Sequence, residues 1–212
     1  MEIRKISVDI DDPAALDEAF STLAPEPIAC CNWPEQYPYA PEVAFRAFHT
    51  GDRLVIRFDV REQVTAARVA EDNGQVWTDS CVEFFAAPDE GGYYNFETTC
   101  IGRMLLGFRA PGREPEHASA EVLAGVKRLA TLPPEPFEER AGDNRWSVTL
   151  LIPPSALFRH DLKTWDGAEL RVNLYKCGDA LSKPHFLSWR PIDAPAPNFH
   201  LPQFFGHFKL KP

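Results

Sequence analysis

The stretch from Gln75 to Pro88, QVWTDSCVEFFAAP, holds the residues of this chain best suited to contact a ligand. Within it, the aromatic residue Trp77 precedes Glu83, a carboxylate set in an apolar run. Such a carboxylate loses hydration unless a donor hydrogen-bonds to it, and a polyhydroxyl ligand supplies donors. The stretch is therefore compatible with a sugar site. Taken alone, these residues favour the other interpretation, in which Trp77, Phe84 and Phe85 belong to the core and an arginine pairs with Glu83.

A strand is predicted to position this carboxylate. Side chains alternate between the two faces of a strand, so Val82 and Phe84 share one face while Glu83 points to the other. The apolar pair is expected to face a core. Glu83 is then expected on the face where a ligand can be reached.

A second strand is predicted over 93–100, YYNFETTC, with the Asp-Glu-Gly-Gly sequence at 89–92 as the turn of a hairpin. Asn95 and Glu97 alternate along it and share one face. An aromatic plate beside carboxylates and amides on paired strands is a plausible arrangement for binding a sugar.

The composition fits one globular domain spanning residues 1–212. Hydrophobic residues make up 44% of the chain and charged residues 25%, which is ordinary for a folded protein. Twenty prolines argue against long helices and for many loops. A chain of this length fits a single all-β sandwich or barrel.

The charge balance excludes some partners. A formal net charge of -9 disfavours binding to nucleic acid or to an anionic membrane surface, and it is compatible with neutral ligands and with Ca²⁺. No apolar run has the length of a membrane-spanning helix, and the first residues do not form a signal segment. We expect a cytoplasmic protein as written, or a secreted or periplasmic one if a leader has been removed.

The chain has five cysteines, and their spacing matches no zinc motif. Reduced, mostly buried thiols are expected. Because Cys81 and Cys100 lie on the two predicted hairpin strands, a cross-link between them is the alternative.

Short alternating runs separated by turn signals predict an antiparallel β-sandwich, jelly-roll or immunoglobulin-like, of about ten strands with one or two short helices. A helical turn is expected over 14–20, a proline-rich loop over 24–41, and a short helix or ordered loop over 64–73. The predicted strands span residues 3–10, 43–49, 53–61, 81–85, 93–100, 103–109, 126–131, 144–152, 169–177, 185–189 and 204–210.

The order of several motifs resembles that of the family 9 carbohydrate-binding modules and their relatives in the DOMON-like β-sandwich group. The likeness runs from about Val43 to the end of the chain. The motifs are WxDSxVEFF from Trp77, YNFE from Tyr94, WxV from Trp146, LRVNLY from Leu170 and FHxPxxFGxF from Phe199.

The resemblance implies that a sugar is held between two aromatic side chains, with a glutamate accepting its hydroxyls and a structural Ca²⁺ often present. Trp77 matches the first aromatic and Glu83 the acceptor. Phe199 stands where the family carries its second aromatic, a tryptophan. No calcium ligand is carried over.

The chain also departs from the family pattern. Glu97 replaces an arginine, Tyr175 stands where the family tends to carry an amide, and Asn198 lies closer to the second aromatic than the family's asparagine does. Together with the residues above, the predicted ligand-binding residues are Trp77, Glu83, Asn95, Glu97, Tyr175, Arg190, Asn198, Phe199 and His200.

The favoured function is non-catalytic binding of a mono- or oligosaccharide in polysaccharide or glycan breakdown, alongside a separate glycoside hydrolase. One alternative is a hydrolase that uses Glu83 and Glu97 as its paired carboxylates. The other is a haem-binding redox domain with Met104 and either His200 or His185 as axial ligands, although no haem is expected because a lone methionine usually serves packing.

Overall fold

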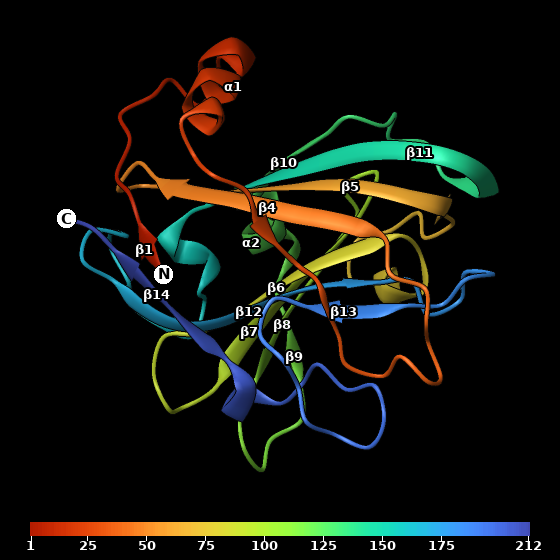
Figure 1. The fold of residues 1–212 in the computed structure, drawn as a ribbon. Helices are drawn as coiled ribbons and strands as arrows, with labels where there is room; N and C mark the ends of the chain where they lie inside the picture. Colours follow the sequence, from red (N-terminus) through yellow and green to blue (C-terminus); the bar gives the residue numbers. More distant parts are fainter.

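The computed structural model describes residues 1–212, and its strands form two sheets packed face to face (Figure 1). The larger sheet has nine strands and the smaller five. The larger contains β1 (Glu2–Ile3), β3 (Cys30–Cys31), β6 (Cys81–Ala87), β7 (Tyr93–Thr99), β8 (Met104–Arg109), β9 (Glu116–His117), β12 (Glu169–Cys177), β13 (Phe186–Ser188) and β14 (Gly206–Leu210). The smaller contains β2 (Glu26–Pro27), β4 (Glu42–His49), β5 (Leu54–Ala67), β10 (Lys127–Ala130) and β11 (Phe137–Ile152).

The strand order places β12, β6, β7 and β8 side by side in the middle of the larger sheet, which runs β1-β14-β12-β6-β7-β8-β9. Strand β13 also pairs with β12, and β3 pairs with β13. The smaller sheet runs β10-β11-β5-β4-β2. All neighbours are antiparallel except β1 and β14, which are parallel. The predicted antiparallel sandwich is confirmed, with fourteen strands in place of about ten.

The largest departures from the predicted strands are at β1, β5 and β11. The predicted strand over 3–10 is wrong beyond Ile3, because residues 4–10 make only one isolated bridge, Lys5 to His49, while Ile6, Val8 and Ile10 pack against the cluster under α1. Strand β5 continues to Ala67, so 64–67 is strand and only the rest of 64–73 is loop, and β11 begins at Phe137 rather than at residue 144. The early part of β11 is mostly exposed and its register against β5 shifts twice before Asn144. Charged residues on an exposed, bulged strand give no apolar alternation, and this is why the pattern hid the extension.

Two short helices complete the fold. Helix α1 (Pro13–Ser21) begins after Asp12, whose carboxylate accepts the Ala14 N–H, and it buries Leu16 and Phe20 against the outer face of the smaller sheet. Helix α2 (Ala120–Gly125), which the sequence did not indicate, places Leu123 in the core. Neither helix is long and apolar enough to span a membrane.

The space between the sheets holds the main core, a cluster of 36 buried residues drawn from both sheets. Val82 and Phe84 lie in it, while Cys81 and Phe85 belong to a different cluster on the outer face of the larger sheet. The alternation predicted for β6 is therefore confirmed.

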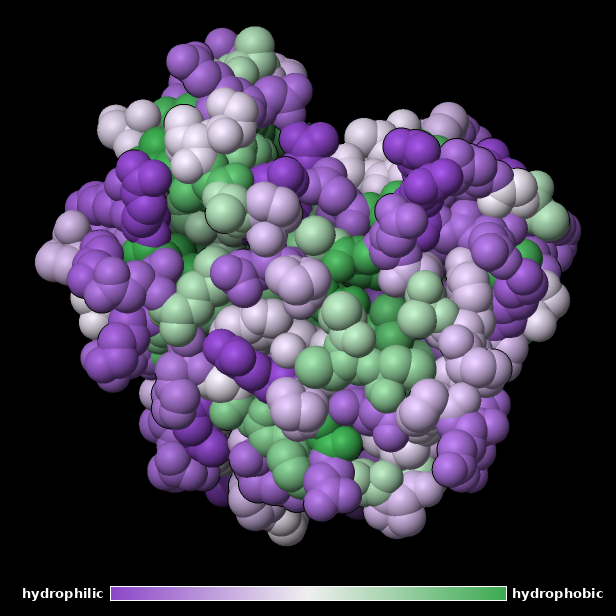
Figure 2. Space-filling view, viewed as in Figure 1, coloured by the Kyte–Doolittle hydropathy of each residue, from purple (hydrophilic) through white to green (hydrophobic).

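The outer face of the larger sheet is also covered, by loops rather than by a third sheet. Trp33, from the proline-rich loop, is buried there and donates its indole N–H to the Ala194 carbonyl at 2.7 Å. The proline-rich loop thus covers part of this face. No large hydrophobic side chain is left exposed, and Figure 2 shows hydrophobic residues interspersed with hydrophilic ones on one face of the molecule.

A buried ion pair links the two sheets. The Lys176 ammonium on β12 lies 2.9 Å from a Glu62 carboxylate oxygen on β5, and both side chains are fully buried. The ammonium also donates to His185 Nε2 at 2.7 Å and to the Cys177 carbonyl at 2.8 Å. Trp146 donates its indole N–H to the other Glu62 oxygen at 2.7 Å.

This network predicts a specific pattern of stability. Lys176→Met leaves the Glu62 carboxylate buried without a counter-charge, which we expect to lower the free energy of unfolding by about 3–5 kcal/mol. Adding Glu62→Gln removes that charge and keeps an acceptor for Trp146, so the double variant should recover at least half of the loss. Urea denaturation measures both, and equal stability of the single and double variants would contradict this account.

Candidate functional site

A polar cleft of about 510 Å³ opens on the outer face of the larger sheet. Its floor is the exposed remainder of β6, β7, β8 and the end of β12, and its walls come from the loops that cover the rest of that face. The lining residues are Asn73, Gln75, Trp77, Glu83, Asn95, Glu97, Leu105, Gly107, Arg109, Pro115, His117, Cys177, Asp179, Phe186, Pro197, Asn198, Phe199 and His200.

Two carboxylates lie together on the floor. Glu83 and Glu97 are direct partners across β6 and β7, and their exposed fractions are only 3% and 4%. The Cys177 thiol donates to Glu83 at 3.0 Å, and the Asn95 amide donates to Glu97 at 2.9 Å. No arginine pairs with either carboxylate, so the alternative in which Glu83 has an arginine partner is wrong.

Burial governs how readily these acids ionise. It raises the pKa of Glu83 well above its usual value, and the nearby Cys177 and Glu97 add to the rise. Burial also raises the pKa of Glu97 to about 7, although the Asn95 amide and the Arg109 guanidinium oppose it. Because water reaches these carboxyls poorly, a ligand group that hydrogen-bonds to them is favoured at the floor.

Strands β7 and β8 add polar groups that have no partner. Asn95 is 1% exposed, and its carbonyl oxygen has no partner in the protein. The Nε–H group of Arg109 is buried and likewise without a partner. Gly107, opposite Asn95 on β8, leaves the needed space, because a Cβ there would lie 2.8 Å from the Asn95 oxygen. Buried polar groups without partners are costly, and a ligand in the cleft can satisfy them.

Aromatic side chains form the walls. Trp77 lies in the short 3₁₀ turn η1 (Val76–Thr78) and is partly exposed, and its carbonyl accepts the Asp179 N–H at 3.1 Å, which ties the turn to the end of β12. Phe199 is 8% exposed and stacks on Tyr175 with ring centroids 4.2 Å apart and an angle of 10°. The Tyr175 hydroxyl donates to the Phe199 carbonyl at 3.1 Å.

His200 and Asn198 occupy the loop beside Phe199. The His200 ring packs on Phe85 at 5.0 Å, and its Nδ1 is hydrogen-bonded to the Tyr93 hydroxyl at 3.0 Å. Asn198 is exposed and accepts the His200 backbone N–H at 2.9 Å. Burial, and to a smaller extent the Arg109 charge, lower the pKa of His200 to about 4.

The structure brings seven of the nine predicted residues to this one cleft and leaves two outside its lining. Tyr175 is fully buried beneath Phe199, so it supports the wall from behind. Arg190 was misplaced by the prediction. Its guanidinium lies 3.9 Å from the centre of the Trp189 ring, on which it stacks, and away from the cleft.

Sequence reasoning missed Arg109, Asp179 and Cys177. The sequence did carry a signal for Arg109. Leu105 and Gly107 are the β8 partners of Glu97 and Asn95, and Arg109, two residues further on, points to the same face of the sheet. Arg109 brings a positive charge to the cleft of a chain that has Glu97 where the resemblance implies an arginine. Asp179 follows the end of β12, and burial raises its pKa to about 6.

The structure shows how the residues that could bind calcium or haem are placed. One group of three side chains has donor atoms within 4.8 Å of one another, namely Cys81, Glu83 and Cys177, and its two sulfurs are poor ligands for Ca²⁺. The implied calcium thus stays a prediction without assigned residues. Met104 lies in the core between the sheets and His200 in the outer cleft, so these two do not face each other. Both ring nitrogens of His185 already have partners within the protein.

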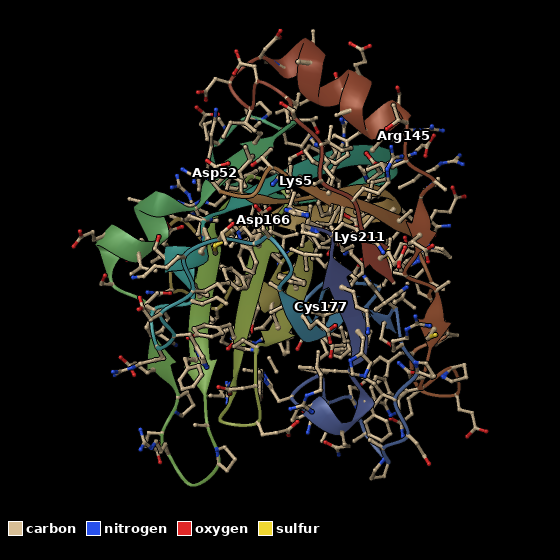
Figure 3. All side chains as sticks on the ribbon, turned by 90° about the vertical axis from the view of Figure 1, so that its left-hand side faces the viewer. Lys5, Asp52, Arg145, Asp166, Cys177 and Lys211 are labelled. Carbon is tan, nitrogen blue, oxygen red and sulfur yellow. The ribbon has the colours of Figure 1, made fainter.

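The cysteines are all free thiols. Cys100 lies in the main core, whereas Cys81 faces the opposite side of the larger sheet, so the alternative cross-link between them is wrong. The residue opposite Cys81 is Cys177 on β12, which Figure 3 labels on the larger sheet.

A β-sandwich with a polar, aromatic-walled cleft on one outer face has the form of a small-ligand-binding protein. A sequence model described as "Carbohydrate-binding family 9" matches residues 11–210. The chain therefore belongs to carbohydrate-binding family 9. The comparison with curated proteins gave no match.

Solved structures agree with this assignment. A protein from Bacteroides uniformis, provisionally described as carbohydrate-binding, is 41% identical over 100% of this chain and 98% of its own, with a TM-score of 0.94. A family 9 module from Caldicellulosiruptor kristjanssonii, solved with glucose, is 12% identical over 100% of this chain and 95% of its own, with a TM-score of 0.60. A family 9 module from the same organism, solved with cellotriose, is 11% identical over 100% of this chain and 93% of its own, with a TM-score of 0.58. At this low identity the last two show the fold alone.

The low pKa of His200 predicts an acid-side loss of stability. The unfolded chain binds a proton near the ordinary histidine value of 6.5, which the folded chain refuses until about pH 4, so stability is lost as the pH falls through this window. His200→Asn removes the titrating ring. We expect the stability advantage of the wild type over this variant to fall by about 1 kcal/mol between about pH 7.5 and pH 5, after allowance for solvent screening.

Urea denaturation at both pH values gives the comparison. His117→Asn is the matched control, because the His117 side chain is exposed at the rim of the same cleft. An unchanged difference for His200→Asn across the window would contradict the low pKa.

Proposed function

We propose that this protein binds a mono- or oligosaccharide in the cleft without cleaving it. The observation that carries the proposal is the convergence of Glu83, Glu97 and the unpaired Asn95 oxygen on one floor, beneath aromatic walls, in a chain of carbohydrate-binding family 9. These groups need hydrogen-bond donors, and sugar hydroxyls are donors of the right size and number.

Aromatic stacking holds the apolar face of the sugar in this proposal. Trp77 and Phe199 line the same cleft from different loops, and the stack of Phe199 on Tyr175 fixes one of the two rings before the ligand arrives. A ring that needs no reordering costs less conformational entropy on binding. Phe199 offers less area than a tryptophan, so Trp77 contributes the larger share.

The polar floor sets the orientation of the sugar. Glu83 and Glu97 accept hydroxyl hydrogens, the Asn95 oxygen accepts a further one, and the Arg109 Nε–H group donates to a hydroxyl or ring oxygen. Asn198 and His200 contribute from the rim. A neutral sugar suits the floor because the buried carboxyls resist ionisation.

Glucose and short glucose chains are the first ligands to test. Family 9 modules of the same fold have been solved with glucose and with cellotriose. We further propose that the protein acts in polysaccharide breakdown together with a separate glycoside hydrolase. In this proposal the cleft residues bind the sugar, and the hydrolase supplies the catalytic residues.

Trp77→Ala tests the stacking. Loss of the indole face should weaken binding of glucose or cellotriose by about tenfold or more, because a stacked ring contributes on the order of 1.5 kcal/mol. Titration calorimetry measures the affinity. Phe137→Ala is the matched control, a partly buried aromatic on β11 of the other sheet, and it should bind like the wild type. Equal affinity of Trp77→Ala and the wild type would exclude the stacked arrangement.

Glu83→Ala tests the acceptor on the floor. Removing a buried acceptor that a sugar hydroxyl requires should weaken binding by about tenfold to a hundredfold. Glu169→Ala, an exposed glutamate on β12, is the control. Incubation of the wild type with cellotriose, followed by chromatography, separates binding from hydrolysis by Glu83 and Glu97. Release of glucose that both Glu83→Ala and Glu97→Ala abolish would establish the hydrolase alternative instead.

A further inference from the structure

We infer that Cys81, Glu83 and Cys177 form a site for a thiophilic divalent metal ion of the zinc class, set into the floor of the cleft. The two thiols and the carboxylate belong to β6 and β12, and all three side chains are buried. The inference goes beyond sugar binding, and its metal site does not depend on any sugar being bound.

Sheet register brings the three side chains together. Cys81 and Cys177 are direct partners across β6 and β12, so their side chains emerge side by side on the same face. Glu83 lies two residues along β6 and therefore points to that face as well. Positions on paired central strands are held more firmly than positions on loops, and this suits a preformed site.

The distances fit a single small ion. The donor atoms all lie within 4.8 Å of one another, and Cys177 Sγ is 3.0 Å from Glu83 Oε1. A tetrahedral zinc ion binds sulfur at about 2.3 Å and carboxylate oxygen at about 2.0–2.2 Å, which sets its ligand atoms roughly 3.5–4 Å apart. Side-chain adjustments of this size need no movement of the strands.

Donor chemistry selects the class of ion. Two thiolates with one carboxylate favour zinc or cadmium over calcium or magnesium, which require oxygen ligands. Each thiol gives up its proton when it binds the ion, and Glu83 binds as the carboxylate, so at least two protons are released per ion. The ion then neutralises the negative charge of these ligands, which the Lys176 ammonium does not do because it pairs with Glu62.

The site has an open side. Cys177 and Glu83 line the cleft, whereas Cys81 lies beneath them and does not, so an ion enters from the cleft and its fourth ligand position faces that space. A water molecule from the cleft fills this position. An ion on Glu83 occupies one of the oxygens that would accept a sugar hydroxyl, and its fourth ligand takes up space in the cleft, so metal and sugar compete. This consequence alone rests on the proposed function.

Cadmium titration of the reduced, metal-free protein tests the inference. Thiolate-to-metal charge-transfer absorption should saturate at one ion per chain, with at least two protons released. Cys81→Ala should weaken cadmium binding by at least a hundredfold. Cys100→Ala is the matched control, since Cys100 is equally buried but lies in the core on the other side of the larger sheet, and it should titrate like the wild type.

Several results would overturn the inference. They are the absence of the absorption band in the wild type, an undiminished band in Cys81→Ala, and a mass loss of two hydrogens that shows a disulfide between Cys81 and Cys177 under the reducing conditions used. Circular dichroism verifies the fold of the variant. Should Cys81→Ala fail to fold, the wild type still decides, because zinc should raise its unfolding midpoint and magnesium, which requires oxygen ligands, should not.

Sugar calorimetry keeps the two proposals separable. Because Cys81 is outside the cleft lining, Cys81→Ala should bind glucose or cellotriose like the wild type, without the competition by zinc that the wild type shows. Normal sugar binding with no cadmium absorption in the wild type would overturn the metal site alone. Cadmium binding without any sugar binding would overturn only the proposed function.

Discussion

Burial of the larger sheet on both of its faces is the constraint on which the rest of the structure depends. Its inner face packs against the smaller sheet. Its outer face carries Phe85, Tyr93 and Tyr175, which would be exposed to water if loops did not cover them. The cover is incomplete over the middle of β6, β7 and β8. The cleft is the part of this face that the loops leave uncovered, and for that reason its floor is both rigid and largely shielded from water.

A floor of this kind changes the behaviour of ordinary side chains. A glutamate on an exposed strand would be ionised and hydrated, whereas Glu83 and Glu97 keep their protons more tightly and Asn95 has an oxygen without a partner. Polar groups left in this state favour a ligand rich in hydroxyls. The same shielding makes neighbouring thiols a plausible coordination site once an ion replaces their protons. Both proposals thus arise from the same low exposure of one sheet face.

Alternation of apolar and polar residues was sufficient to predict the sandwich, the hairpin at β6 and β7, and the side of β6 that carries Glu83, because a period of two is enforced wherever one face is buried. It failed where that enforcement is absent, in the exposed start of β11, and where an apolar pattern is too short, in α2. The position of Arg190 depended on whether a long side chain stacks on a ring or reaches the cleft, and local sequence does not determine such a choice.

The Lys176 ammonium has a wider significance than the stability of the interior. It holds the peptide carbonyl of Cys177 from the inner side, while the Cys177 side chain belongs to the cleft on the outer side, so one residue pair spans the thickness of the sheet. The interior charge network and the cleft are therefore connected directly through Cys177. Substitutions that relax the interior around Glu62 will therefore alter the shape of the cleft, although neither Glu62 nor Lys176 lines it.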